Sequence, residues 1–309
     1  MKPLTAPDVR GVWGTTLLPL AGDGAIDWER QGAQIDALAA SGVDGVYAHG
    51  TAGEFHALEE DEFDKVNTLL AERCEAAGLP FQIGGSHPAT PVMLSRVRRA
   101  AALEPGAIQV ILPDWVPLND DEVIRFLVGA AEAAGGVPLV LYNPPHAKTQ
   151  VPPRVLARAT REVPQLIGVK MAGGDHLWYA EMTAAVPSLS IFIPGHLLAT
   201  GLARGAHGSY SNIAAMSPRG AVAWFRLMTT NPAAALDVER RIGEFFQLHI
   251  APLQAAGLSN PALDKFLAMV GGWADIGTTL RWPASSAPAD AVAPARADAH
   301  RLLPELFPA

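Results

Sequence analysis

The chain contains almost no cysteine. Cys74 is the only cysteine among its 309 residues. A single thiol cannot form a disulfide within the chain, and it cannot supply the several thiolates that structural zinc sites use. We therefore expect no disulfide framework and no thiolate-rich zinc site, in keeping with a reducing cytoplasm.

Charged residues and long hydrophobic runs are also scarce. Only 17% of the residues are charged, the formal net charge is −8, and no basic stripe is present to neutralise phosphates. The longest apolar runs fall short of the roughly 18 residues that cross a bilayer, and the opening MKPLTAPDVRGVW lacks the pattern of a secretory signal. These absences argue against nucleic acid and membrane as partners, and indicate a cytoplasmic protein that binds a small molecule.

What the chain does have is one pattern that repeats, a short apolar run followed by a segment with helical spacing. The runs are 12–20, 44–51, 81–86, 107–113, 138–145, 166–174, 189–195 and 206–212, and the segments after them are 26–42, 59–78, 92–103, 120–135, 152–160, 176–186, 196–205 and 216–230. Near-continuous apolar runs are typical of parallel strands that are covered on both faces. Eight such units predict an α/β fold, a closed (β/α)8 barrel over residues 1–230.

The strand pattern stops after residue 230. Helical spacing continues in 236–250, 260–272 and 297–307, and an alanine and proline connector spans 282–295. We expect residues 231–309 to form a C-terminal helical extension of the barrel.

A lysine lies inside one of the apolar runs. Lys170 stands in LIGVKM, where an unpaired ammonium would be costly to bury. Barrels of this kind carry their chemistry at the C-terminal ends of the strands, and a neutral amine there can attack a carbonyl to form a Schiff base. Position alone leaves two interpretations equal, a Schiff-base lysine and a lysine that pairs with an inward carboxylate or reaches the rim.

Polar residues end two other runs. Tyr142 closes the fifth run, VLYNPP, and a tyrosine there is usually a core ring with its hydroxyl at the surface. If neighbouring strands bring it beside Lys170, its phenol can relay a proton to an iminium. At the end of the second run, GTAGE (50–54) is typical of a tight turn, whose amides can also bind an anion such as a carboxylate.

These motifs together resemble the dihydrodipicolinate synthase and N-acetylneuraminate lyase superfamily of class I aldolases. The resemblance runs over roughly residues 8 to 300, through GTAGE, YNPP, GVK and GAHGSYSN, and it includes the family's spacing between Tyr142 and Lys170. It implies that Lys170 forms an imine with pyruvate or a related 2-oxo acid, without a metal or an organic cofactor. It also implies that Tyr142 relays protons and that the Thr51 hydroxyl orients Tyr142.

The same resemblance implies the remaining parts of the site and the assembly. The backbone amides of Thr51 and Ala52 are expected to hold the carboxylate of the 2-oxo acid, and Tyr210 is expected to pack over the imine. The family commonly has a second hydroxyl residue at the position of Ala52, so the carboxylate here depends more on backbone amides. The resemblance further implies a homo-oligomer, either a tetramer or a dimer.

Two regions depart from the synthases that make dihydrodipicolinate. Those enzymes use a paired tyrosine after the fourth strand and an arginine shortly after the tyrosine of the fifth, where this chain has Asp114 and Trp115, and His146 and Lys148. Lys148 offers a point charge but not the two-pronged geometry with which arginine binds a carboxylate. We expect Asp114, Trp115, His146 and Lys148 to shape a specificity pocket for another partner, with ordinary loop packing as the alternative.

The sequence is therefore compatible with three functions. The leading one is a lyase, an aldolase or a dehydratase, that acts on pyruvate or another 2-oxo acid or 2-oxo sugar acid through a lysine Schiff base. The second is 4-hydroxy-tetrahydrodipicolinate synthase, with Lys148 in place of the missing arginine. The third, of another class, is a non-catalytic barrel that binds 2-oxo acids.

Overall fold

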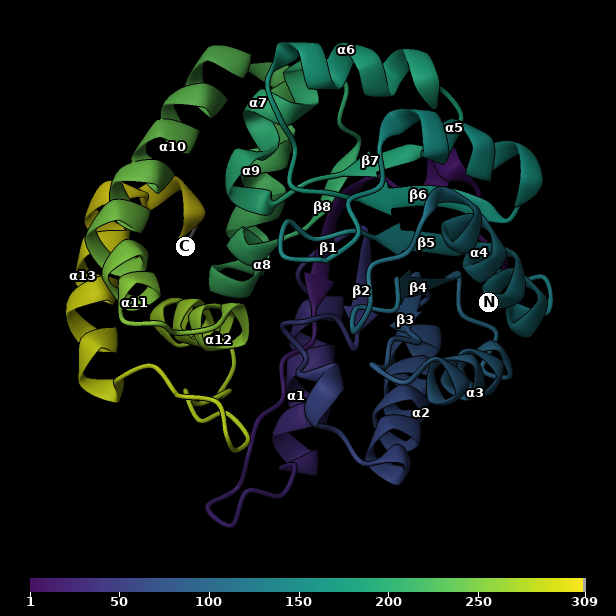
Figure 1. Cartoon of the computed structure of the whole chain (residues 1–309). Coiled ribbons are helices and arrows are strands. Elements are labelled where there is room, and N and C mark those ends of the chain that lie inside the picture. Colours follow the sequence, from purple (N-terminus) through teal and green to yellow (C-terminus); the bar gives the residue numbers. More distant parts are fainter. Residues whose placement is uncertain (308–309) are drawn as a thin grey trace.

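A computed structural model describes residues 1–307 of the chain (Figure 1). In this part of the chain, eight parallel strands close into a barrel in which each strand pairs with its sequence neighbours and β8 pairs with β1. The strands are β1 Gly11–Thr15, β2 Gly45–Ala48, β3 Phe81–Gly84, β4 Ala107–Ile111, β5 Leu139–Tyr142, β6 Leu166–Lys170, β7 Ser190–Phe192 and β8 Gly208–Tyr210. The (β/α)8 barrel expected from the repeated pattern is confirmed.

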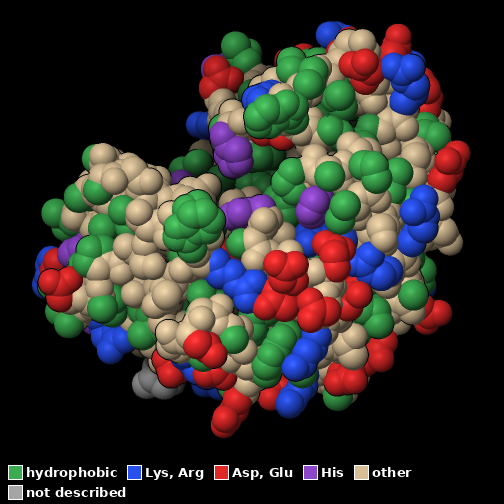
Figure 2. Space-filling model, turned by 60° about the horizontal axis from the view of Figure 1, so that its bottom comes forward, with side chains coloured by type: hydrophobic (Ala, Val, Ile, Leu, Met, Phe, Trp, Pro, Cys, Tyr) green, Lys and Arg blue, Asp and Glu red, His purple; other side chains and the backbone are tan. Residues whose placement is uncertain are grey.

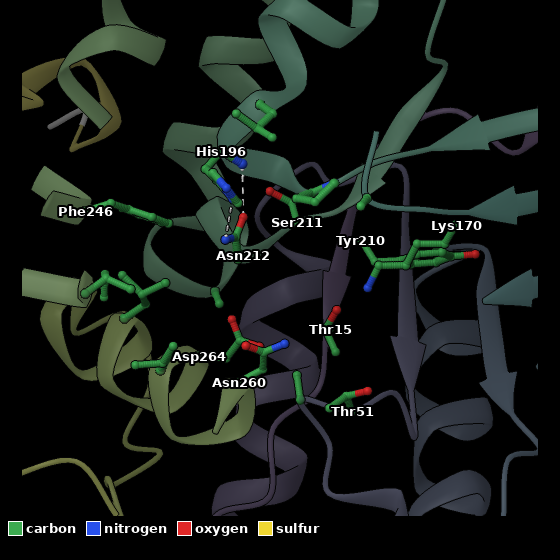
Figure 3. A pocket seen from close by; sticks show the side chains of 18 of the residues that line it. Thr15, Thr51, Lys170, His196, Tyr210, Ser211, Asn212, Phe246, Asn260 and Asp264 are labelled. Carbon is green, nitrogen blue, oxygen red and sulfur yellow. Dashed lines mark hydrogen bonds between the residues drawn. The ribbon is translucent and has the colours of Figure 1, made fainter. Parts of the chain in front are cut away.

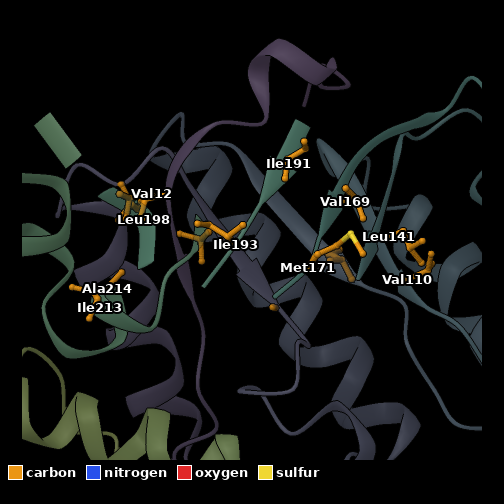
Figure 4. Packing of buried hydrophobic residues seen from close by; sticks show 14 of the residues in the cluster. Val12, Val110, Leu141, Val169, Met171, Ile191, Ile193, Leu198, Ile213 and Ala214 are labelled. Carbon is orange, nitrogen blue, oxygen red and sulfur yellow. The ribbon is translucent and has the colours of Figure 1, made fainter. Parts of the chain in front are cut away.

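Helices surround the barrel and bury the outer face of its strands. They are α1 Trp28–Ala39, α2 Glu60–Ala76, α3 Thr90–Ala101, α4 Asp120–Ala134, α5 Pro153–Glu162, α6 His176–Ala185, α7 Leu198–Ala203, α8 Asn212–Met216 and α9 Pro218–Thr230. Figure 4 shows this outer layer, where strand residues such as Val169 and Ile191 lie in one buried cluster with Leu198 and Ile213 of the helices. This double cover explains why the strand sequences are apolar without interruption.

The interior of the barrel is partly polar. Tyr47 and Gln109 share a hydrogen bond, and the Tyr210 hydroxyl donates to Gln82 Oε1 at 2.5 Å. The Tyr210 ring also packs edge-on against Trp13, with 6.1 Å between the ring centres. The hydroxyl of Tyr210 is thus occupied within the barrel.

Further helices lie opposite the C-terminal ends of the strands, at the left of Figure 1. They are α10 Pro232–Phe245, α11 Ala251–Ala255, α12 Asn260–Gly271 and α13 Val292–Leu302. α12 packs against α8, and α13 packs against both α10 and α12. The C-terminal helical extension is therefore present, and its boundary with the barrel at residue 230 stays a prediction. No helix within residues 1–307 has both the length and the apolar character needed to cross a membrane.

The helices of the extension differ from the expected ones in two places. The helix expected over 236–250 begins at Pro232 and changes to a π-helical segment, Phe246–Ile250, before α11. Pro252 follows this segment, and because proline has no N–H it interrupts the regular ladder of helical hydrogen bonds. The helix expected at 297 begins at Val292 inside the alanine and proline connector, since a proline in the first turn of a helix loses no helical hydrogen bond.

Candidate active site

A cavity of about 710 Å³ lies between the mouth of the barrel and the C-terminal helices. Figure 2 shows the surface hollowed between the lobe that carries these helices and the barrel. The residues on the barrel side include Thr15, Thr51, Ala52, Tyr142, Lys170 and Tyr210, and those on the other walls include His196, Asn212, Glu239, Arg240, Phe246, Asn260 and Asp264 (Figure 3). The cavity therefore has the position at which (β/α)8 barrels carry their active sites.

Lys170 and Tyr142 lie side by side at the mouth. They are direct partners in the register of β5 and β6, and the backbone N–H of Asn143 donates to the Lys170 carbonyl at 2.9 Å. The Lys170 Nζ atom is 4.3 Å from the centre of the Tyr142 ring and 5.6 Å from that of Tyr210. No carboxylate within residues 1–307 lies within ion-pair distance of this amine. The arrangement leaves the amine free to meet a ligand beside a phenol.

The loop after β2 presents unpaired backbone amides to the cavity. Gly53 and Glu54 donate their backbone N–H groups to Gly50 and Thr51, whereas the N–H groups of Thr51 and Ala52 donate to no described residue. Gly50 lies so close to the Tyr47 ring that an added Cβ would be 2.6 Å from it, which requires glycine at this turn. Adjacent free amides of this kind form a concave site for an anion. The Thr51 hydroxyl also lines the cavity, but no hydrogen bond joins it to Tyr142 within the described residues.

A buried ion pair anchors this loop to the C-terminal extension. Glu54 has a left-handed backbone with φ of 52°, and its Oε1 atom lies 2.6 Å from Lys265 Nζ on α12. Its other oxygen accepts a hydrogen bond from the backbone N–H of Arg281 at 3.0 Å, and Lys265 donates to the Thr279 carbonyl at 2.5 Å. The pair therefore holds the amides of the loop and the middle of α12 in one arrangement.

Burial keeps several titratable groups around the loop and barrel uncharged. His49 stacks on Phe63, and burial, with the nearby Arg96 charge adding to it, lowers the pKa of His49 to about 3. Burial raises the pKa values of the Tyr210 and Tyr47 phenols above their usual range. These groups are therefore neutral at physiological pH, and Tyr210 offers its ring rather than a proton to the amine of Lys170.

A histidine and an asparagine form another wall of the cavity. Asn212 Oδ1 accepts from the backbone N–H of His196 at 3.1 Å, so its Nδ2 group is the end that faces His196 Nδ1 at 3.0 Å. This places the ring proton of His196 on Nε2. Burial lowers the pKa of His196 although the bond from Asn212 opposes that shift. His196 is thus a neutral hydrogen-bond donor, and its ring packs 5.0 Å from that of Phe246.

Asp264 of α12 supplies a carboxyl group across the cavity from Lys170 (Figure 3). No described residue forms a hydrogen bond or an ion pair with its side chain. Burial raises the pKa of Asp264 to about 7, and the charge of Lys170 opposes this shift. Near neutral pH the group is therefore close to half protonated.

The structure separates two groups of residues that the sequence placed in one site. Lys170, Tyr142, Thr51, Ala52 and Tyr210 all line the cavity.

Asp114, Trp115, His146 and Lys148 do not line it within the described chain. They lie on the loops after β4 and β5, where the Lys148 N–H donates to Asp114 at 2.7 Å and Lys148 Nζ donates to the Trp115 carbonyl at 2.9 Å. The Trp115 side chain is 86% exposed. Their part in substrate choice stays a prediction.

Sequence reasoning overlooked Asp264, His196 and Asn212. Asp264 stands in a segment read only as an amphipathic tail helix, where a charged residue usually faces solvent. Asn212 ends the eighth apolar run, and nothing in the sequence identifies its hydrogen-bond partner. The available signal was the position of His196 directly after the seventh apolar run and of Asn212 at the end of the eighth, at the same end of the barrel as Lys170.

Comparison with known proteins gives the following relatives. The sequence model of the dihydrodipicolinate synthetase family matches residues 8–288. A 4-hydroxy-tetrahydrodipicolinate synthase of Thermomicrobium roseum is 30% identical over 291 residues, which cover 91% of this chain and 91% of that protein. Another enzyme of that name, from Xanthomonas axonopodis, is 27% identical and covers 84% of this chain and 93% of its own.

Solved structures share the architecture at lower identity. A sialic acid aldolase of Ruminococcus gnavus has a TM-score of 0.85 at 18% identity and covers 97% of this chain and 99% of its own. A prophage protein of the dihydrodipicolinic acid synthase family from E. coli, solved in complex with pyruvate, has a TM-score of 0.84 at 20% identity and covers 95% and 98%. At these identities the likeness concerns the fold alone.

Proposed function

Because this chain belongs to the dihydrodipicolinate synthetase family and is an aldolase-type lyase, we propose that it acts on pyruvate or a related 2-oxo acid through an imine at Lys170. The observation that carries this proposal is the position of the amine. Lys170 Nζ meets the cavity 4.3 Å from the centre of the Tyr142 ring, without an ion pair to any described residue. The unpaired amides of Thr51 and Ala52 line the same cavity and support a site for the carboxylate of the ligand.

The proposed reaction begins when the neutral amine attacks C2 of the 2-oxo acid, and loss of water from the carbinolamine gives a protonated imine. In the cleavage direction, a base takes the proton of the C4 hydroxyl, the bond between C3 and C4 breaks, and its electron pair moves to C3 as an enamine. An aldehyde leaves, C3 takes a proton, and water hydrolyses the imine to release pyruvate. Condensation reverses these steps, and dehydration removes a proton from C3 and the C4 hydroxyl as water.

Each residue on the barrel side has a proposed role. Tyr142 is the acid and base that moves protons beside the imine, because its ring already lies against the amine. Thr51 orients the Tyr142 hydroxyl once a ligand is bound, and the amides of Thr51 and Ala52 hold the carboxylate. Tyr210 packs its ring near the imine while its hydroxyl stays bonded to Gln82.

A second candidate is 4-hydroxy-tetrahydrodipicolinate synthase, which condenses pyruvate with aspartate semialdehyde. It is favoured by the name of the relative from Thermomicrobium roseum. The absence of a tyrosine after β4 and of an arginine near His146 and Lys148 argues against it. Incubation with pyruvate and aspartate semialdehyde decides the question, because a lack of turnover would remove this candidate.

The assembly and location expected from the sequence also stay proposals. A homo-oligomer, a tetramer or a dimer, is expected in the cytoplasm. Light scattering after size-exclusion chromatography would measure the mass, and a value of 32.5 kDa for the species in solution would contradict the expected oligomer.

Reduction with borohydride tests the imine directly. Pyruvate with borohydride is expected to add a stable mass to the peptide that contains Lys170, and Lys170→Ala should lose the adduct. An unchanged mass across pyruvate and several longer 2-oxo acids would refute the imine mechanism.

A further inference from the structure

The charged side chains of the cavity differ in whether they have partners. Arg240 is ion-paired with Asp237 at 2.8 Å and also with Glu244. Glu239 accepts hydrogen bonds from the hydroxyl of Thr200 and from its backbone N–H, the latter at 3.0 Å. Within residues 1–307, Lys170 and Asp264 are the charged residues of the cavity left without a hydrogen-bond or ion-pair partner. A ligand in the cavity therefore meets an unengaged amine on one side and an unengaged carboxyl on another.

The position of Asp264 is set by its neighbour in the chain. Lys265 is fully buried and paired with Glu54, the last residue of the loop whose amides line the cavity. Successive residues of a helix point about 100° apart, so anchoring Lys265 away from the cavity directs Asp264 toward it. Figure 3 shows Asp264 and Asn260 on the wall that faces Lys170. The distance between the carboxyl and the amine is thereby held by a buried ion pair rather than by a flexible loop.

Among the cavity residues in the described part of the chain, no free cation other than Lys170 is available to bind a second carboxylate on the ligand. Arg240 is already shared between two acidic side chains. The sequence offered Lys148, on the loop after β5, as a cation for a second carboxylate. Its Nζ group instead donates to the Trp115 carbonyl outside the cavity. The walls around Asp264 instead carry uncharged hydrogen-bonding groups, among them Asn260, Asn212 and the neutral His196.

We propose that Asp264 determines the class of substrate at this site by admitting 2-oxo acids with an uncharged tail and rejecting those whose tail ends in a carboxylate. The inference rests on the proposed imine at Lys170, which fixes the 2-oxo end of the ligand and leaves the tail to extend toward α12. A carboxylate tail there meets the like charge of Asp264 without a cation to compensate it, and like charges brought together in a desolvated site disfavour binding. An uncharged tail meets hydrogen-bond donors and acceptors.

The rejection is expected to strengthen as the pH rises. Burial raises the pKa of Asp264 to about 7, so the group gains its charge between pH 6 and pH 8. The other titratable or charged groups on the surrounding elements are Tyr47 of β2, Tyr142 of β5, Lys170 of β6, His196 after β7, Tyr210 of β8, Glu239 and Arg240 of α10, and Lys265 of α12 itself. Of these, Arg240 and Lys265 are ion-paired, and Lys170 forms the same imine with each ligand that is compared.

The test compares two five-carbon 2-oxo acids on the full-length protein. The protein is incubated with 2-oxopentanoate, whose tail is uncharged, or with 2-oxoglutarate, whose tail is a carboxylate, and the imine is trapped with cyanoborohydride. The rate of adduct formation at Lys170 is measured by mass spectrometry at pH 6 and pH 8. The discrimination is the rate with 2-oxopentanoate divided by the rate with 2-oxoglutarate. At pH 8 this ratio should be about tenfold or more lower in Asp264→Asn than in the unchanged protein. In the unchanged protein the ratio should rise from pH 6 to pH 8.

Three further variants make the result interpretable. Asp264→Glu keeps the charge and should keep the discrimination, and Asp290→Asn, which removes an exposed carboxylate outside the cavity, should leave the ratio of the rates unchanged. Asp264→Ser repeats the test if the asparagine variant does not fold. If pyruvate forms an adduct at Lys170 but the ratio of the rates with the two five-carbon acids is the same in Asp264→Asn and in the unchanged protein, this inference alone is overturned. No adduct at Lys170 with pyruvate or with either acid overturns the proposed function, and the inference with it.

Discussion

Removal of the lysine from the buried pair of Glu54 and Lys265 should destabilise the whole protein. The Lys265 side chain is 0% exposed, that of Glu54 is 2% exposed, and the two charges lie 2.6 Å apart. In Lys265→Met, Glu54 keeps a hydrogen bond from the backbone of Arg281 but loses its counter-charge. Breaking a buried pair in this way costs about 3–5 kcal/mol, because the remaining charge is left without compensation. We therefore expect the free energy of unfolding to fall by about that amount.

Urea unfolding, followed by circular dichroism, measures this loss. Arg154→Met is the matched control, because Arg154 pairs with Asp120 at the surface, where the side chains are 71% and 46% exposed. A surface pair of this kind contributes no more than about 1 kcal/mol. The double variant Glu54→Gln, Lys265→Met removes both charges and should recover part of the stability lost by Lys265→Met alone.

Two outcomes would refute the reasoning. Lys265→Met could prove no more destabilising than Arg154→Met, which would mean that the buried carboxylate finds another partner or becomes protonated at no cost. The double variant could prove less stable than Lys265→Met, which would mean that the Glu54 carboxylate stabilises the fold even without Lys265, through the hydrogen bond from the backbone of Arg281. In either case the ion pair would not hold the loop of Thr51 and Ala52 against the C-terminal helices.

Three other predictions concern the cavity. Burial raises the pKa of Asp264 from 3.8 to about 7, so ionisation costs stability as the pH rises above 3.8, and the cost is complete above 7. Asp264→Asn should therefore match the unchanged protein near pH 4 and be up to about 4 kcal/mol more stable at pH 8 in thermal or urea unfolding, and an equal difference at both pH values would contradict this. Lys170→Ala should show the same unfolding transition as the unchanged protein yet give no borohydride adduct. An adduct on another lysine would refute Lys170 as the residue that forms the imine. Tyr142→Phe should still trap pyruvate but turn over about 10²–10⁴-fold more slowly once a substrate is in hand, and an unchanged rate would remove Tyr142 as the proton relay.

The adjacency of Lys170 and Tyr142 could be predicted from the sequence. Eight apolar runs in alternation with helical segments determine a parallel barrel, and in such a barrel the fifth and sixth strands are neighbours whose C-terminal ends meet at one mouth. Thr51 ends the second run and Ala52 follows it, so both reach the same mouth for the same reason. Their presence in one cavity is thus a consequence of strand order, whereas their chemical roles stay proposals.

The loops after the fourth and fifth strands show where this reasoning ends. Asp114, Trp115 and Lys148 also follow strand ends, yet they bond to one another and lie outside the cavity. Strand order brings a loop to the mouth, but the course of the loop depends on its own hydrogen bonds. The sequence carries no periodic signal for those bonds.

By itself the sequence determined the barrel, the helical extension and the strand ends that share a mouth, because hydrophobic periodicity and strand order are local and repetitive properties of the chain. Only the tertiary structure decided what covers that mouth. From the sequence alone, the polar face of α12 could simply face solvent. In the structure, Lys265 on this face pairs with Glu54, 211 positions earlier in the chain (265 − 54), and that contact directs Asp264 toward Lys170. Periodicity identifies the apolar face of a helix, but it does not identify what the polar face meets, since that depends on contacts between distant parts of the chain.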